Sequence, residues 1–162
     1  MIMIKKFPVL IFCLLLLCNS LQANQSIRAF SDTTEMFEKI KLNERQFKLQ
    51  KPRQLKKIET TDSLIVYGCD KHHANITSVM VINRHLENKY YWFINNKLFK
   101  ITLQTLPKKI SGKKQRRGKG FYFIENDTVF YKEEKGVAKD VNALISEANK
   151  YLSEGLKVLQ EQ

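Results

Sequence analysis

Cysteine is scarce in this sequence, with three residues in a chain of 162. Cys13 and Cys18 lie in the N-terminal apolar segment, so that Cys69 alone remains if this segment is removed. A chain with one cysteine forms no internal disulfide, whereas small secreted domains of animals and plants usually carry several. The scarcity therefore argues for a bacterial origin and for a hydrophobic core that needs no covalent cross-links.

The signatures of common enzyme classes are also missing. The sequence has no glycine-rich phosphate loop, no Gly-x-Ser-x-Gly and no His-Glu-x-x-His. Glu133 and Glu134 are adjacent acids at the end of an expected strand, where solvated side chains are a simpler interpretation than an acid–base pair. We therefore expect a protein that is not an enzyme and holds no cofactor.

Long apolar runs are confined to the N-terminus. Lys5 and Lys6 precede the apolar run Phe7–Cys18, and the small residue Ala23 follows it, which is the order of a secretory signal peptide. The run is shorter than the roughly 20 apolar residues that a membrane-spanning helix needs. We predict a signal peptide over residues 1–23 and a periplasmic or secreted protein. An uncleaved helix lying on the membrane is an alternative.

Lipid anchoring is the second alternative at this end of the chain. Leu15-Leu16-Leu17-Cys18 resembles a bacterial lipobox in its leucine and its cysteine. That motif usually has glycine, alanine or serine immediately before the cysteine, where this sequence has Leu17. Cleavage after Ala23 is therefore the favoured interpretation, and a lipoprotein anchored to the membrane through Cys18 is the alternative.

The sequence carries a large excess of positive charge. It has 28 Lys and Arg against 16 Asp and Glu, and the loss of Lys5 and Lys6 with the signal peptide lowers the net charge from +12 to +10. In an exported protein, this charge favours an anionic membrane surface, lipopolysaccharide, a wall polymer or an envelope protein as the partner. Export makes nucleic acid a less favoured partner than these envelope components.

Hydrophobic periodicity predicts an α+β fold. Residues 24–57 are expected to hold a leader, an N-terminal helix from about Thr33 to Gln50 and a basic linker from Lys51 to Lys57. Residues 58–162 are expected to form an antiparallel β-meander of about five or six strands with a C-terminal amphipathic helix packed on the sheet, in a single domain with residues 31–57. The expected strands are 64–67, 76–82, 90–94, 98–103, 121–125 and 129–131.

Two hairpins look like one motif used twice. The segments Tyr91–Phe99 and Phe121–Phe130 each place aromatic strands around an asparagine-containing turn, and the second turn is read as one residue longer. These hairpins and the closing helix resemble a group of small exported bacterial proteins of uncharacterised function, over roughly Ile58 to Leu159. The resemblance implies an antiparallel sheet with flanking helices and no catalytic residue.

A cysteine lies close to two histidines in Gly68-Cys69-Asp70-Lys71-His72-His73. Zinc and copper accept thiolate and imidazole ligands, so a metal-binding or redox protein using Cys69, His72 and His73 is one hypothesis. A cysteine–histidine nucleophile pair is another. No second spaced pair of ligands accompanies them. The simpler interpretation is a polar connection between two strands, with Cys69 a small apolar filler.

The basic segment, residues 108–119, contains the densest charge of one sign. Its seven cations are Lys108, Lys109, Lys113, Lys114, Arg116, Arg117 and Lys119. We interpret it either as an anion-binding patch or as a solvated connection between two hairpins. Its continuation into Phe121-Tyr122-Phe123 partly matches an RNA-recognition signature, but a hairpin follows where that fold has a helix. RNA binding is therefore rejected.

The aromatic strand residues suggest where a ligand would bind. Alternation places Tyr90 and Trp92 on one face of their strand and Tyr91 and Phe93 on the other. Two helices are too few to cover both faces of the sheet, so Tyr90 and Trp92 are candidate exposed aromatics unless both sets form buried core. We hypothesise a non-catalytic exported protein that binds an anionic envelope component or a partner protein. A small periplasmic hydrolase inhibitor is a further alternative.

Overall fold

The structure of the chain is a computed structural model. It describes residues 33–83, 86–105, 117–137 and 139–161, together with the backbone of 109–110 and 113–114. The expected signal peptide, Cys18, Lys108 and Arg116 lie outside the described residues. The described elements are α2 (Thr33–Leu49), β1 (Arg53–Glu59), β2 (Ser63–Cys69), β3 (Ile76–Asn83), β4 (Glu87–Ile94), β5 (Lys97–Thr105), β6 (Lys109–Ile110), β7 (Lys113–Lys114), β8 (Lys119–Glu125), β9 (Thr128–Lys135) and α3 (Val141–Gln160).

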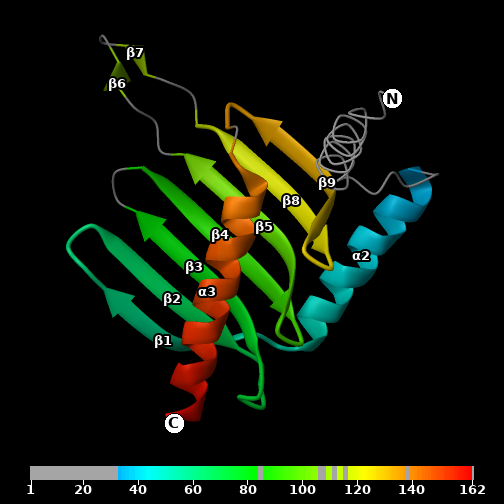
Figure 1. Cartoon of the computed structure of the whole chain (residues 1–162), viewed down its shortest axis with the longest axis vertical. Coiled ribbons are helices and arrows are strands. Elements are labelled where there is room, and N and C mark those ends of the chain that lie inside the picture. The colour runs from blue at the N-terminus through cyan, green and yellow to red at the C-terminus, as the bar shows by residue number, and fades with distance from the viewer. Residues whose placement is uncertain are drawn as a thin grey trace, which may run out of the picture.

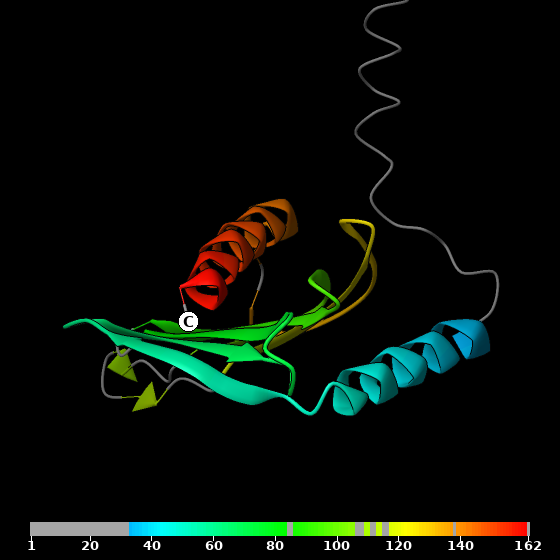
Figure 2. The same cartoon turned by 90° about the horizontal axis from the view of Figure 1, so that it is seen from below.

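Seven of the strands form one antiparallel sheet in the order β1-β2-β3-β4-β5-β8-β9, while β6 and β7 pair with each other. The sheet is a meander into which the β6–β7 hairpin is inserted between β5 and β8. α3 covers one face, and α2 and the β6–β7 hairpin lie on the opposite side (Figures 1 and 2). The expected α+β fold with an N-terminal and a C-terminal helix is confirmed, with seven strands instead of five or six.

The sequence pattern missed the short strands β6 and β7 and one strand of the main sheet, β1, which overlaps the expected basic linker. Its half-buried residues Leu55 and Ile58 are three positions apart, so simple alternation would place them on opposite faces. A β-bulge between Gln54 and Lys56 shifts the register, and both apolar side chains pack against the core. The other positions are exposed and mostly charged, as suits an edge strand.

The hydrophobic core lies between α3 and the sheet. One row of cross-strand partners runs through its centre: Tyr67, Val79, Tyr91, Ile101 and Tyr122. Each is at most 1% exposed. α3 contributes Leu144, Ile145 and Ala148 to the same core. This helix begins where Asp140 accepts hydrogen bonds from the backbone of Asn142 and Ala143.

Gly155 allows α3 to approach the sheet closely. A Cβ atom at this position would lie 2.9 Å from Cδ1 of Tyr67 and 3.0 Å from Cδ1 of Ile76. A glycine inside a helix costs roughly 1 kcal/mol relative to alanine. Packing against the sheet explains its presence here, and the helix continues past it to Gln160.

The two aromatic hairpins share one geometry. Asn95-Asn96 and Asn126-Asp127 are both two-residue turns with positive φ at each residue, as type I′ turns require. A β-bulge follows in the second strand of each hairpin. The expectation that the second turn is one residue longer was wrong. Trp92 of the first hairpin corresponds to Phe123 of the second, and with this alignment both turns contain two residues.

α2 docks at the turn ends of these hairpins, on the side of the sheet opposite α3 (Figure 2). The ring centroid of Phe47 lies 5.3 Å from that of Trp92 and 5.7 Å from that of Phe99. Just beyond the helix, the side chain of Gln50 donates a hydrogen bond to a β4 carbonyl and accepts one from the N–H of Asn95. These contacts fix the helix to one end of the sheet.

Candidate binding face of the sheet

The sheet face opposite α3 is only partly covered. α2 lies at one end of the strands, and the β6–β7 hairpin lies at the other end (Figures 1 and 2). Antiparallel partners present their side chains to the same face of a sheet. The strand register therefore defines three rows of side chains across this surface, which we call the binding face.

The polar row lies at the end of the sheet from which β6 and β7 extend. Its members are cross-strand partners on four adjacent strands: Asn88, Gln104, Lys119 and Lys135. Both lysines are exposed, and neither forms an ion pair with another residue in the described part of the chain. This end of the binding face is therefore positively charged.

The apolar row is the next one along the strands: Val66, Met80, Tyr90, Thr102 and Phe121. Its four apolar side chains are half-buried, although α3 lies on the other face and the aromatic rings of α2 contact Trp92, Phe99 and Tyr131, which do not belong to this row. The row extends over four spacings between strands, or about 19 Å. An accessible apolar strip beside charged residues is typical of a binding surface.

The aromatic row lies under α2: Trp92, Lys100, Phe123 and Tyr131. Lys100 pairs with Glu44 of α2 at 2.7 Å. Trp92 stacks on Tyr90 with ring centroids 6.3 Å apart and an interplanar angle of 11°. The predicted exposed aromatics, Tyr90 and Trp92, therefore share one face and are both half-buried. Tyr90 lies in the open part, and α2 contacts Trp92.

A cavity of about 230 Å³ lies at the polar row. Its lining comes from β4, β5 and the start of β8: Asn88, Gln104, Thr105, Arg117, Gly118 and Lys119. The side-chain oxygen of Asn88 is buried and has no hydrogen-bond donor among the described residues. The hydroxyl of Thr105 accepts a 2.8 Å hydrogen bond from the N–H of Gly118. This hydrogen bond joins the two ends of the segment that carries the β6–β7 hairpin.

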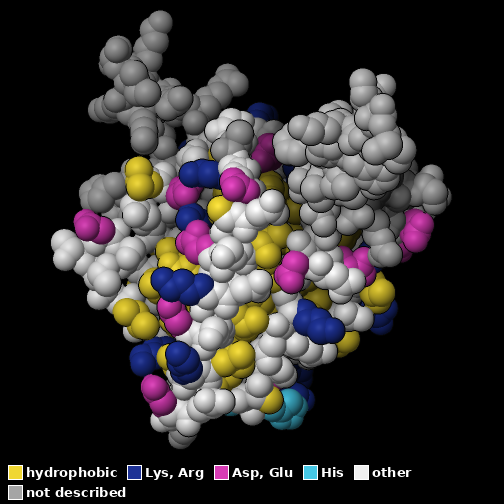
Figure 3. All heavy atoms as spheres, in the orientation of Figure 1, with side chains coloured by type: hydrophobic (Ala, Val, Ile, Leu, Met, Phe, Trp, Pro, Cys, Tyr) yellow, Lys and Arg dark blue, Asp and Glu magenta, His cyan; other side chains and the backbone are white. Residues whose placement is uncertain are grey.

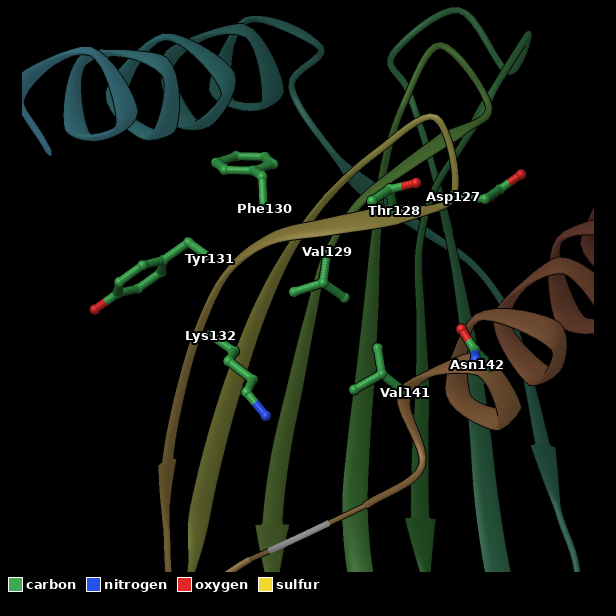
Figure 4. Close-up of a pocket in the computed structure, with 8 residues that line it drawn as sticks. All are labelled: Asp127, Thr128, Val129, Phe130, Tyr131, Lys132, Val141 and Asn142. Carbon is green, nitrogen blue, oxygen red and sulfur yellow. The ribbon is translucent and has the colours of Figure 1, made fainter. Parts of the chain in front are cut away.

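A second cavity, of about 170 Å³, lies between β9 and the start of α3. Figure 4 shows Val129 and Val141 pointing toward each other across it, with Lys132 beside them, whereas Phe130 points to the α2 side of the strand. Lys132 lies 3.5 Å from Glu134. This cavity has a mixed polar and apolar lining, and its cation has a partner.

The α3 side of the molecule has a different distribution of charge. Lys89 on β4 pairs with Glu147 of α3 at 2.6 Å, and Lys139 pairs with Glu87 at 3.2 Å. Figure 3, which views this side, shows Lys and Arg side chains interspersed with Asp and Glu. On the binding face, Lys119 and Lys135 of the polar row have no such acidic partner in the described part of the chain.

Asp70 organises the loop between β2 and β3. Its side chain is buried and accepts hydrogen bonds from the backbone of His72 and Ala74 and from the amide of Asn75, at 2.8 to 3.1 Å. Burial alone would raise the pKa of Asp70, but these hydrogen bonds outweigh it and lower the pKa below the usual aspartate range. The loop is therefore held by a buried carboxylate.

The cysteine of this loop is buried, and its Sγ lies 3.7 Å from Nδ1 of His73, while His72 is exposed. Burial, followed by the charge of Asp70, raises the pKa of the Cys69 thiol. A protonated thiol is both a poor nucleophile and a poor metal ligand. Within the described part of the chain, no group of three or more His, Cys, Asp or Glu side chains is placed to hold a metal ion.

The basic segment is described in part. Arg117 and Lys119 have exposed side chains, and both line the cavity at the polar row. Lys109 lies in β6, and Lys113 and Lys114 form β7. Figure 2 places these two strands on the same side of the sheet as the binding face. Lys108 and Arg116 lie outside the described residues.

Part of the binding face was predicted from the sequence. The predicted residues include Tyr90 and Trp92 and the cavity-lining cations Arg117 and Lys119, but not Asn88, which the same alternation along β4 reaches. Met80 and Phe121 join the face only through the register between strands. A single sequence carries no direct signal for that register.

No protein family, curated protein or solved structure matches this chain. Neither of the two described helices is long and apolar enough to cross a membrane. Its function is therefore inferred from the binding face.

Proposed function

We propose that this chain is an exported bacterial protein without catalytic activity that binds an anionic component of the cell envelope through the binding face. The observation that carries the proposal is the position of Arg117 and Lys119. These cations are exposed and have no acidic partner in the described part of the chain. They lie beside the apolar row, whose four apolar side chains are only half-buried.

Electrostatic attraction supplies the first part of the binding. A basic residue close to an anionic surface contributes about 1 kcal/mol, and the basic segment carries seven such residues without an acid. Burial of accessible apolar area would add to this at about 25 cal/mol per Å². The electrostatic contribution favours an anionic surface over a neutral one, and the apolar contribution strengthens binding to either.

The proposal is tested by sedimentation with lipid vesicles. We expect the protein to sediment with phosphatidylglycerol vesicles and not with phosphatidylcholine vesicles. We also expect binding to weaken as added salt shortens the Debye length from about 10 Å at 0.1 M to about 3 Å at 1 M. A variant with Lys113→Ser, Lys114→Ser, Arg116→Ser and Arg117→Ser should lose most of its binding.

The matched control removes four cations elsewhere: Lys71, Lys97, Lys150 and Lys157. It changes the net charge equally and should keep most of the binding. Equal losses of vesicle binding in the two variants would show that binding depends on net charge alone and not on the position of the basic segment. Salt-insensitive sedimentation of all three proteins would contradict the proposal.

A further inference from the structure

We propose that the cavity at the polar row is a head-group site for an anionic amphiphile. A phosphate that carries a neighbouring hydroxyl group binds in the cavity, and the attached alkyl chain lies along the apolar row. This inference rests on the proposed function and names the ligand class that the binding face takes. It uses only residues whose side chains are described.

The positive charge of two residues that line the cavity favours a phosphate as the ligand. Arg117 and Lys119 line it and have no ion pair within the described part of the chain. Asn88 and Gln104, whose side chains carry amides, also line it. Guanidinium, ammonium and amide N–H groups all donate to phosphate oxygens, and the charged donors form the stronger bonds. The cavity offers many times the space that one water molecule needs.

The carboxamide of Asn88 adds a second requirement. Its oxygen is buried without a donor, and a buried polar group without a partner is unfavourable. The two ends of a carboxamide are assigned from their hydrogen bonds, so either a donor or an acceptor is needed at this position. A phosphate with a neighbouring hydroxyl supplies both, as in a phosphoglycerol head group.

The apolar row begins immediately beside the cavity. Asn88 and Tyr90 are two residues apart on β4, as are Lys119 and Phe121 on β8, and two residues span about 6.6 Å along a strand. From Phe121 the row leads through Tyr90 and Met80 to Val66.

The direction of the alkyl chain follows from the residues at the two ends of this row. On the β9 side, the partner of Phe121 is Glu133, which is exposed and acidic. On the β2 side the row ends at Val66. The alkyl chain is therefore placed toward β2, over Tyr90 and Met80.

Trp92 gives a direct readout of binding because it is the only tryptophan of the chain and stacks on Tyr90 of the apolar row. Its fluorescence is titrated with lysophosphatidylglycerol below the critical micelle concentration. Saturable binding is expected, and two added methylene groups in the alkyl chain should strengthen it roughly 15-fold, from about 0.8 kcal/mol for each buried methylene. Glycerol phosphate, which lacks the chain, and lysophosphatidylcholine, which lacks the net negative charge and the hydroxyl groups of the head-group glycerol, should bind far more weakly.

Two variants separate the head-group site from the chain site. Arg117→Gln with Lys119→Gln should weaken lysophosphatidylglycerol binding at least tenfold, because charged hydrogen bonds are lost. The matched control, Lys71→Gln with Lys97→Gln, removes two exposed cations at the other end of the sheet and should change affinity less than twofold. Met80→Ser should weaken binding of the lipid and leave the weak binding of glycerol phosphate unchanged.

Several results would overturn the inference. These are the absence of saturable binding, equal affinity for lysophosphatidylcholine, equal affinity for glycerol phosphate, or equal effects of the two double variants at equal melting temperatures. If the protein sediments with anionic vesicles but does not bind the monomeric lipid, this inference fails and the proposed function stands. If neither binds, both fail.

Discussion

The hydroxyl group of Tyr122 on β8 donates a 2.5 Å hydrogen bond to the carboxylate of Glu134 on β9. This bond ties the buried row beneath α3 to the last strand of the sheet. The hydrogen bond from Tyr122 is the main cause of the lowered pKa of Glu134. Burial acts to raise this pKa, and Lys132 lowers it further. The carboxylate is therefore more stable in the folded protein than in the unfolded chain.

We expect Tyr122→Phe to lower the free energy of unfolding at neutral pH by about 1.5 to 3 kcal/mol, as for a hydrogen bond to a charged group. A lowered folded-state pKa adds stability above the ordinary glutamate value of about 4.3, and this stability is lost as the pH falls through the folded value. The difference between wild type and variant should therefore shrink in acid.

Urea unfolding of both proteins at neutral and at acidic pH measures this difference. Tyr131→Phe, a half-buried tyrosine with no hydroxyl hydrogen bond in the described part of the chain, is the matched control and should change stability little. If Tyr122→Phe lowers the free energy of unfolding equally at neutral and acidic pH, the hydrogen bond to Glu134 is not the source of the lost stability.

Gly155→Ala is expected to destabilise the protein even though alanine is the better helix former. The gain of about 1 kcal/mol in helix propensity is opposed by contacts of the new Cβ with Tyr67 and Ile76 at about 3 Å. Overpacking of this kind costs about 1 to 3 kcal/mol. Asn149→Ala on the exposed side of α3 is the control and should be neutral or stabilising. Thermal melts that rank the two variants in the opposite order would show that α3 packs less closely than described.

Asp70→Ala should lower the free energy of unfolding by about 1 to 3 kcal/mol, because three donors of the β2–β3 loop lose their buried acceptor. His72→Ala, an exposed neighbour, should stay within about 0.5 kcal/mol of wild type. Chemical unfolding of the two variants gives both numbers. A metal-dependent rise in melting temperature that His72→Ala abolishes would instead support the metal-binding hypothesis.

Export is tested at the N-terminus of the protein recovered from cells. Lys5, Lys6 and the apolar run that follows predict that the mature chain begins at Asn24. N-terminal sequencing decides this directly. Fatty acid attached to Cys18 would establish the lipoprotein alternative, and a chain that still begins at Met1 would contradict both.

The sequence predicts the parts of the fold whose periodicity is local. α3 is one example, because its apolar residues recur every three or four positions. The hairpins at Asn95-Asn96 and Asn126-Asp127 are another, since asparagine and aspartate tolerate the positive φ that the turns need. β1 escaped prediction because a bulge at Leu55 breaks its period of two and charged residues fill the rest of the strand.

The binding face was predictable only in part, for a different physical reason. Tyr90 and Trp92 share a face by alternation within one strand, which a sequence shows. The polar row depends on Asn88, Gln104 and Lys119 being in register across three strands, and that register is set by tertiary packing. The docking of Phe47 on Trp92 likewise joins residues far apart in the chain.

The most direct test of the account is an NMR map of the protein with phosphatidylglycerol bicelles. Trp92 provides the single indole N–H signal of the chain. We expect this signal and the amide signals of Tyr90 and Phe121 to shift as bicelles are added, while those of exposed α3 residues such as Ser146 and Asn149 should stay unchanged. Shifts confined to α3, with the indole signal of Trp92 unchanged, would contradict the account.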